Sequence, residues 1–283
     1  MRPNSIFFDV GLNGLSLRGS FKKFKQENLK KMSTAIENYK KAREAKELTA
    51  HFCQFFNASI AKSASELDKC FRIRHEVYCE EMGYLPLCDD KLERTHVDEH
   101  SLHCTIQHKL SKHFAGTVRL VYTQSEDQKL PVEQFCINSI TDTAFHPSNF
   151  PREEICEISR LAVPASFRRR KMDKFKNAAT GGINEYEYSE EELRCFPFVA
   201  IGLYLAAGAA ALRTNRSHVF VMMEPRLARN MQFVGISFKQ IGETVNYHGK
   251  RAPYYINAHD FKRELKSAFK NMLGNIDQQL YHD

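Results

Sequence analysis

The segment at residues 154–163, EICEISRLAV, constrains the fold more than any other. Apolar and β-branched residues dominate it and Pro164 ends it, a pattern that predicts a buried strand. Glu157 and Arg160 nevertheless lie inside the segment. Buried charges are costly unless they are paired or used in a reaction. The rest of the chain must therefore supply either partners or a function for both side chains.

The composition is that of a globular protein with an excess of basic residues. The chain has 283 residues, of which 42 % are apolar and 27 % are charged, enough for one large domain or two small ones. The formal net charge is +7. This charge suits an acidic partner, which includes nucleic acid, an anionic membrane, a phosphate-bearing cofactor and an acidic carrier protein. It does not choose among them.

The cysteines and the first residues favour a cytoplasmic protein with reduced thiols. The eight cysteines include no C-x-x-C pair, and Cys70, Cys79 and Cys88 recur every nine residues. This spacing fits neither a zinc site nor a tight disulfide framework. The sequence starts without the charged segment and long apolar stretch of a secretory signal. We therefore expect a cytoplasmic location.

The N-terminal part of the chain is basic and its residues favour helix. Residues 18–48 contain ten Lys and Arg against four Glu. We assign residues 1–55 to a basic helical extension, either a solvated helix or a surface for an acidic partner or a membrane.

Residues 56–283 alternate between helical and strand patterns. The predicted helices are 65–82, 196–213, 224–234 and 259–273, and the predicted strands are 102–109, 114–123, 154–163, 217–223, 236–242 and 253–257. The uncharged stretch 196–212 is rich in Ala and Gly, and we expect a buried helix there rather than a membrane span. A basic stretch at about 168–193 lacks periodicity and predicts a mobile insertion. The pattern predicts one α/β (α+β) domain, with a central mixed sheet and helices on both faces.

Further polar and aromatic residues accompany Glu157 and Arg160. They are Arg74, Tyr78, Tyr84, Glu93, Asp98, Arg119 and Ser159. Arginines and carboxylates from separate elements can form a buried ion-pair network, which is a structural role. They can equally line a reaction site, and the residue types leave both readings open.

The spacing of these residues resembles that of the acyl-homoserine-lactone synthases and the related long-chain N-acyl amino acid synthases. The shared runs are R-x-x-V-Y-x-x-x-x-G-Y (74–84), E-x-x-x-x-D (93–98), Arg119 in a strand and E-x-S-R-L-A-V (157–163). Residues 222–238 and 247–256 resemble acyltransferases associated with exosortase systems. The resemblance covers about residues 60–265. It departs at Tyr78 and Tyr84, where the first family usually has Phe and Trp, and at Thr95, where it has an acid.

This resemblance implies a single GNAT-like domain that transfers an acyl chain to the α-amine of an amino acid. The catalytic candidates are Glu157, Glu93 and Arg160, with one of the glutamates taking the proton of the amine. The substrate-binding candidates are Arg74, Tyr78, Tyr84, Asp98, Arg119 and Ser159. GNAT folds use a bulged strand, whose free N–H groups face the thioester carbonyl. Since Glu157 and Arg160 would face opposite sides of a regular strand, we predict a β-bulge within 158–163.

The resemblance also implies the nature of the acyl donor. The usual Gly-rich phosphate loop is missing, and Arg168, Arg169, Arg170 and Lys171 stand in its place. This cluster is either a solvated charge run or a binding surface for acyl carrier protein and its phosphate. The expected donor substrate is therefore acyl-phosphopantetheine on that carrier, with no bound cofactor and no metal. Helix 196–212 and strand 217–223 are candidates to enclose the acyl chain, although a plain core helix fits equally well.

Two other functions remain open from the sequence. One is a lactone-forming synthase that uses S-adenosylmethionine as acceptor, and the other is a non-catalytic protein that binds nucleic acid or membrane. The first reading involves no nucleic acid and allows contact with a membrane surface through the N-terminal helix. A metal at His96, His100, His103 and Asp98 and a nucleophilic Cys156 are weaker interpretations. Tyr247, His248, Arg251 and Tyr254 are further candidates for contacts with the substrates.

Overall fold

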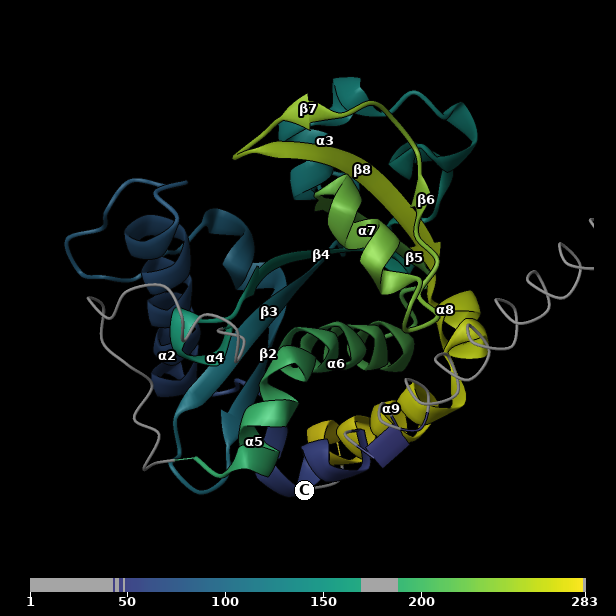
Figure 1. The fold of residues 1–283 in the computed structure, drawn as a ribbon. Helices are drawn as coiled ribbons and strands as arrows, with labels where there is room; N and C mark the ends of the chain where they lie inside the picture. The colour runs from purple at the N-terminus through teal and green to yellow at the C-terminus, as the bar shows by residue number, and fades with distance from the viewer. Residues whose placement is uncertain (1–42, 44–45, 48, 169–187, 282–283) are drawn as a thin grey trace, which may run out of the picture. The chain divides into compact units, whose positions relative to one another are not determined.

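The computed structural model describes residues 43, 46–47, 49–168 and 188–281 (Figure 1). The chain divides into two compact units, Met1–Ala45 and Lys46–Asp283. The predicted extension 1–55 lies mostly outside the described residues, and its boundary at residue 55 stays a prediction. Most of the predicted insertion also lies outside the described residues.

An eight-stranded mixed sheet forms the centre of the larger unit. The strands are β1 Phe56–Ile60, β2 Ser101–His108, β3 Phe114–Tyr122, β4 Ile155–Ala162, β5 His218–Met223, β6 Lys239–Gln240, β7 Val245–Asn246 and β8 Lys250–Asn257. Their order is β1-β2-β3-β4-β5-β8-β6, with β7 paired to β8. Only β4 and β5 pair in parallel among these strands. The predicted buried strand and mixed sheet are confirmed, and the predicted strands 102–109 and 114–123 pair with each other as β2 and β3.

Helices cover both faces of this sheet, as predicted. The helices are α2 Ala64–His75, the π-helical turn η1 Glu76–Glu81, α3 Pro131–Phe135, α4 Ala165–Arg168, α5 Glu190–Cys195, α6 Val199–Arg213, α7 Pro225–Met231, α8 Ala258–Glu264 and α9 Ser267–Tyr281. Short 3-10 turns include η2 His96–His100 and η8 Phe196–Phe198. Helix α2 lies on one side of β2–β4, and α6 with α9 lies on the other (Figure 1).

Helix α6 packs closely on the sheet because it lacks large side chains where it meets its neighbours. A Cβ atom at Gly202 would lie 2.8 Å from Ile106, and one at Gly208 would lie 2.4 Å from Phe261. The helical segment Glu192–Arg213 is long and apolar enough to cross a membrane, but 72 % of its apolar window is buried inside the fold. This burial agrees with the predicted core helix.

Strand β4 contains the predicted bulge. Arg119 of β3 pairs with Ser159, and Thr117, two residues earlier, pairs with Ala162. One extra residue therefore lies on β4 between these pairs, and Arg160 has a φ of +52°. A non-glycine residue in this left-handed region is uncommon and strained. The prediction of a bulge within 158–163 is confirmed.

Strands β4 and β5 separate at this bulge. Their parallel ladder runs from Ile155 to Ile158 on β4 and from His218 to Val221 on β5. Beyond it, β4 pairs with β3 and β5 pairs with β8. Among the described strands, no pairing joins β4 to β5 after Ile158, so the sheet opens beside Arg160.

Other sequence expectations were wrong in detail. The predicted helix 259–273 is two helices, because Leu265 has an extended ψ of 135° that ends α8. The predicted strand 236–242 is reduced to Lys239–Gln240, and β1 and β7 were not predicted. The predicted helix 65–82 ends as the π-helical turn η1.

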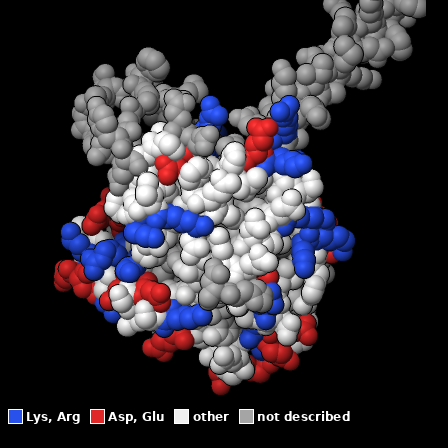
Figure 2. Space-filling view, turned by 90° about the horizontal axis from the view of Figure 1, so that it is seen from below, with Lys and Arg blue, Asp and Glu red and all other residues white. Residues whose placement is uncertain are grey.

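The charged residues do not gather on the face of the molecule that Figure 2 shows. Lys and Arg alternate there with Asp and Glu around a largely uncharged centre. Among the described residues, this face offers no continuous basic surface of the kind that nucleic-acid binding favours.

A substitution at Gly116 tests how closely β3 approaches the part of β4 that follows the bulge. A Cβ atom at this position would lie 2.7 Å from the carbonyl oxygen of Ala162 and 2.9 Å from Leu203. We expect Gly116→Ala to lower the free energy of unfolding by about 1–3 kcal/mol, because the backbone must move. Denaturant unfolding measures this change.

Gly274→Ala in α9 is the matched control. A Cβ atom there meets nothing within 4 Å. Because alanine is the better helix former, we expect this substitution to stabilise the protein by about 1 kcal/mol. Equal effects of the two substitutions would contradict the close approach at Gly116.

Candidate active site

A network of buried charges lies between α2 and the sheet. Arg74 of α2 is 0 % exposed and donates to Asp98 through Nη1 at 2.7 Å and Nη2 at 3.1 Å. Arg119 of β3 is 1 % exposed and donates to the same Asp98 Oδ1 at 2.8 Å. Asp98 also accepts from the backbone N–H of Thr95 at 2.7 Å. The carboxylate of Asp98 therefore holds together helix α2, strand β3 and the turn η2 in which it lies.

The charges of this network hold Asp98 in its ionised form. Burial raises the pKa of Asp98, but hydrogen bonds and charges from Arg74 and Arg119 outweigh burial and leave the pKa lowered. Arg119 also donates to the hydroxyls of Thr95 at 2.7 Å and Ser159 at 3.1 Å. Arg119 Nη1 thus uses the hydroxyl of Thr95 as a second acceptor beside Asp98. Asp98 has the properties of a structural anion rather than a base.

Glu93 extends the network to the bulge. It accepts from Arg74 Nε and, at 3.1 Å, from Arg160 Nε. The hydroxyl of Tyr78 donates to the carbonyl oxygen of Leu161 at 2.7 Å. The guanidinium of Arg160 also lies 5.7 Å from the centre of the Tyr78 ring. Side chains from α2, η1 and the following loop therefore hold the bulged backbone in place.

Glu157 differs from the other two acids because no arginine hydrogen bond to it occurs in the described part of the chain. It is 2 % exposed, and its Oε2 accepts from the backbone N–H of Val132 at 2.6 Å. Burial raises the pKa of Glu157 to about 7, although the Val132 hydrogen bond and the charges of Arg119 and Arg160 lower it. A carboxylate with such a pKa can take up a proton near neutral pH.

The hairpin of β7 and β8 forms a second wall of the site. Its turn has His248 and Gly249 in the left-handed region, with φ values of 51° and 95°, as tight hairpin turns require. A Cβ atom at Gly249 would lie 3.8 Å from the hydroxyl of Tyr84. Burial raises the pKa of Tyr247, whereas the nearby charge of Arg160 lowers it. The hairpin therefore lies against the predicted aromatic and charged residues.

Arg251 of this hairpin faces the same region. Its Nε donates to the carbonyl oxygen of His248 at 3.2 Å. Burial raises the pKa values of Tyr78 and Tyr204, and the charge of Arg251 lowers both. The influence on both phenols places this guanidinium near η1 and near α6.

An apolar pocket lies behind the opening between β4 and β5. Its lining consists of Ile158, Tyr204, Gly208, Val219, Ile236, Phe238, Ile256, Ala258 and Phe261. Ile158 immediately follows Glu157 on β4 and therefore faces the opposite side of the sheet. The pocket and the charged network thus flank the same strand opening. Its wall includes α6 and β5, the two elements that the sequence suggested for an acyl chain.

The remaining residues that the sequence suggested for the site have different surroundings in the structure. Arg168 pairs with Glu81, whereas Arg169, Arg170 and Lys171 lie outside the described residues. His103 is buried 3.5 Å from Asp98, and Cys156 is a fully buried thiol whose pKa is raised by burial. A thiol of this kind is a poor nucleophile.

Sequence analysis missed Val132 and Tyr204 as site residues. Val132 contributes only its backbone N–H to Glu157, so its side chain gives no signal. Tyr204 lies in the apolar helix α6, where the sequence pattern predicts that an aromatic residue belongs to the hydrophobic core. Only the tertiary fold places either residue at the site.

Comparison with known proteins agrees with this geometry. Residues 73–176 match the family described as acetyltransferase (GNAT) domain. This region of the chain is therefore similar to GNAT acetyltransferase domains. The match contains the end of α2, the β2–β3 hairpin, the bulged strand β4 and α4, and thus the residues of the charged network. No curated protein matches the sequence.

Solved structures show where the fold recurs. TofI, in a ternary complex with an inhibitor and MTA, has a TM-score of 0.53 at 14 % identity, over 76 % of this chain and 99 % of TofI. The CoA-dependent acyl-homoserine lactone synthase BjaI, with SAM and isopentyl-CoA, has a TM-score of 0.51 at 14 % identity, over 78 % and 89 %. FeeM, an N-acyl amino acid synthase from uncultured soil microbes, has a TM-score of 0.49 at 16 % identity, over 76 % and 97 %.

These similarities concern the fold of the chain and the class of the matched region. The GNAT match assigns an acyltransferase domain, and the first two structures share its fold along most of their length. At such low identity the shared fold does not specify donor or acceptor.

Removal of Arg74 tests the buried network. Arg74→Met leaves Glu93 and Asp98 partly unpaired in a buried environment, and we expect it to cost about 3–5 kcal/mol of stability. Arg94→Met is the matched control, because Arg94 and its partner Asp90 are 50 % and 54 % exposed. We expect the control to cost less than about 1 kcal/mol. Denaturant unfolding compares the two variants.

Glu157 makes folding stability dependent on pH. Its pKa rises from 4.5 to about 7 on folding, so between these values the folded state holds a proton that the unfolded state has lost. Its contribution therefore falls as pH rises through this window, by up to about 3 kcal/mol. Glu157→Gln keeps an acceptor for Val132, and we expect it to remove this loss. Unfolding curves at about pH 5 and about pH 8 measure it, and an unchanged pH dependence in the variant would refute the raised pKa.

Proposed function

We propose that this protein is an N-acyltransferase that moves a medium-to-long acyl chain from a thioester donor to the α-amine of an amino acid. The observation that carries the proposal is Glu157, a buried carboxylate with a raised pKa in the bulged strand β4. The guanidiniums of Arg119 and Arg160 influence this carboxylate, but the described residues include no arginine that hydrogen-bonds to it. Such an acid suits proton removal from an amine.

The first step removes a proton from the acceptor. A free α-amine has a pKa of about 8 and is largely protonated at neutral pH. Glu157 takes one proton from this ammonium group, directly or through a water molecule, and leaves a lone pair on nitrogen. Glu93 is the weaker candidate for this task, because Arg74 and Arg160 both donate to its carboxylate.

The second step joins the amine to the thioester. The nitrogen attacks the carbonyl carbon, and the tetrahedral intermediate carries a negative charge on oxygen. Backbone N–H groups that the separation of β4 from β5 leaves free are suited to stabilise this oxygen. The C–S bond then breaks, the thiolate leaves and takes up a proton, and the nitrogen loses its remaining excess proton to form the amide.

The charge balance of the site supports binding of an anion. Arg74, Arg119 and Arg160 face two carboxylates that accept their hydrogen bonds, Glu93 and Asp98. When Glu157 holds a proton, one positive charge is in excess. This excess favours an oxyanion or the carboxylate of an amino acid in the site.

Arg251 is our candidate for the residue that orients the acceptor. Its Nε is held by the carbonyl oxygen of His248, and its Nη atoms make no hydrogen bond within the described residues. A guanidinium can bind a carboxylate in a bidentate manner. Tyr84 and Tyr247 stand nearby and can close the acceptor side.

The apolar pocket is the proposed entrance for the acyl chain. Its cavity of about 20 Å³ holds little more than one water molecule, so the pocket must widen to admit a medium-to-long chain. Its lining of Ile158, Tyr204, Val219, Phe238 and neighbouring residues lies beyond the strand opening. A thioester carbonyl at the bulge would direct its tail toward this pocket and present the acceptor to Glu157. An apolar wall favours an alkyl chain by removing its surface from water.

Acyl carrier protein is the proposed donor, with acyl-phosphopantetheine as substrate and no resident cofactor. The net charge of +7 and the basic run that starts at Arg168 suit an acidic carrier. The proposed location is the cytoplasm, with contact to a membrane surface through the basic N-terminal segment. The experiment below compares this donor with acyl-coenzyme A, the kind of molecule that is present in the BjaI structure.

The decisive experiment offers the protein a matrix of donors and acceptors. Acyl carrier proteins and coenzyme A carrying chains of increasing length are each incubated with the common amino acids and, separately, with S-adenosylmethionine. Mass spectrometry then identifies the products. We expect N-acyl amino acids from the carrier-protein donors. An acyl-homoserine lactone would replace the proposal by the lactone synthase, and a folded protein that yields no product would contradict both.

Glu157→Gln tests the proposed base in the same assay. We expect kcat/KM of the native protein to rise with pH to a plateau above about 7, and the variant to lose about 10²–10⁴-fold. The exposed Glu153→Gln on the turn before β4 is the control and should retain activity. A Glu157→Gln variant with full activity would remove Glu157 as the base.

A further inference from the structure

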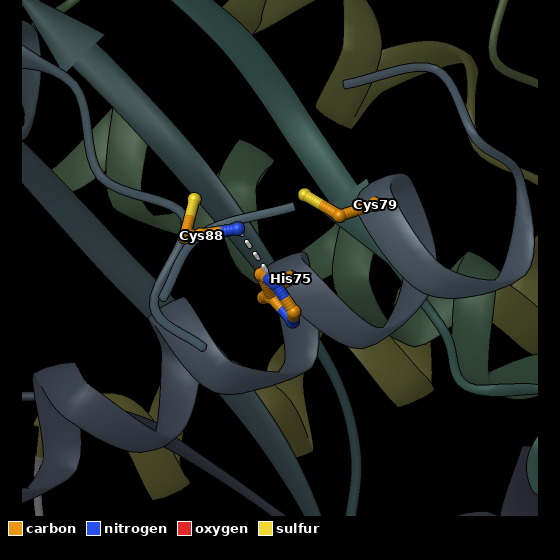
Figure 3. Close-up of side chains that lie close together, drawn as sticks. All are labelled: His75, Cys79 and Cys88. Carbon is orange, nitrogen blue, oxygen red and sulfur yellow. Dashed lines mark hydrogen bonds between the residues drawn. The ribbon is translucent and has the colours of Figure 1, made fainter. Parts of the chain in front are cut away.

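Three ligand-type side chains meet at the junction of α2 and η1. His75 ends α2, Cys79 lies one turn later in η1, and Cys88 comes from the loop that follows (Figure 3). One ligand atom from each residue lies within 4.8 Å of the other two. Within the described residues, this is the only such group of three that involves thiols and imidazole. Sequence analysis expected no metal site and did not bring these residues together.

We propose that His75, Cys79 and Cys88 bind one zinc ion. Two thiolates and an imidazole are a donor set that Zn²⁺ favours, with a fourth position for water. Tetrahedral bonds of about 2.3 Å to sulfur and about 2.0 Å to nitrogen place ligand atoms about 3.5–3.8 Å apart. The observed upper limit of 4.8 Å requires only small side-chain movements to reach this geometry.

The surroundings of His75 prepare it as a ligand. Its Nε2 accepts a hydrogen bond from the backbone N–H of Cys88 at 3.1 Å, and its Nδ1 lies 3.3 Å from Glu80 Oε1. The first contact leaves a lone pair on Nε2, and the second suits a proton on Nδ1. A metal-bound histidine commonly donates its other N–H to a carboxylate in this way. Zinc would take the Nε2 lone pair in place of the Cys88 N–H.

Burial and charge also fit a zinc site with an entry path for the ion. His75 and Cys79 are 2 % and 5 % exposed, whereas Cys88 is partly exposed. Zn²⁺ with two thiolates and a neutral imidazole has no net charge, so it adds no buried charge next to the ion pairs of Arg74. Burial raises the pKa of the Cys79 thiol to about 11, so zinc must displace a proton to bind there.

The proposed zinc would fasten the loop that forms one side of the acyltransferase site. This loop contains Tyr84 and leads to Glu93, whose backbone N–H donates to the carbonyl of Phe71 at 3.1 Å. Glu93 at the end of the loop pairs with Arg74, and Cys88 in its middle lies against His75. The ion has a structural role here, and the inference does not depend on the identity of the substrate.

The test starts from the full-length reduced protein and zinc alone. Elemental analysis after dialysis should find one zinc per chain, and competition with a chromogenic chelator gives the affinity. Cobalt(II) should give a thiolate-to-metal charge-transfer band and the intense visible bands of a tetrahedral site. Zinc should also raise the midpoint of thermal unfolding, because it binds the folded protein.

Matched variants identify the ligands. Cys88→Ser and Cys79→Ser should lose the stoichiometric zinc and the cobalt band, whereas Cys53→Ser, a partly exposed thiol outside the cluster, should keep both. Glu80→Gln should weaken zinc binding about 10–100-fold, as expected for removal of a carboxylate that holds a ligand histidine. Glu80 is a surface residue at 43 % exposure, so this variant should fold normally.

Two outcomes would overturn the proposal. One is zinc binding that is absent, or that is equal in Cys88→Ser, Cys79→Ser and Cys53→Ser, which would indicate an adventitious ion only. The other is a Cys79–Cys88 disulfide, found by peptide mapping of the protein as isolated under non-reducing conditions, that zinc does not prevent. Loss of acyl transfer in the experiment above would leave the zinc result unaffected, so the two proposals fail separately.

Discussion

The carboxylate of Asp98 is the interaction on which the site depends. It joins Arg74 of α2, Arg119 of β3 and the backbone of its own turn. The guanidiniums of Arg74 and Arg119 are almost fully buried, so neither can form hydrogen bonds with water instead if the helix moves. A buried charge without a partner costs several kcal/mol, and this cost fixes the position of α2 on the sheet. Glu93 then transmits this position to β4 through Arg160.

The bulge in β4 follows from the same network. Arg160 has a backbone conformation that costs about 1–3 kcal/mol and persists only where its surroundings determine it. Those surroundings are the carboxylate of Glu93, the ring of Tyr78 and the hydrogen bond from Tyr78 to Leu161. The bulge in turn parts β4 from β5. The opening in the sheet thus depends on charges that are held in buried ion pairs. Glu157 has no arginine hydrogen bond within the described residues, and burial raises its pKa to about 7.

The sequence predicted the strand from its local apolar pattern, and it predicted the bulge from the resemblance to GNAT folds together with the spacing of two charged residues. Glu157 and Arg160 are an odd number of residues apart, and only an irregular strand lets them serve one cleft. The approach of Gly249 to Tyr84 could not be predicted, since it joins segments that no local pattern relates. The break between α8 and α9 was missed because neither Gly nor Pro marks it. Long-range packing decided both.

The cluster of His75, Cys79 and Cys88 shows why cysteine spacing alone does not reveal which ligand-type side chains lie together. The nine-residue interval from Cys79 to Cys88 spans a π-helical turn and a loop that returns to α2, and neither is visible as a short metal-binding motif. Arg74 and His75 are consecutive in α2, so they point in directions about 100° apart around the helix. Arg74 therefore reaches the sheet while His75 reaches the returning loop. One end of one helix organises both the charged network and the thiol cluster, and the loop between them is held at Cys88 and at Glu93.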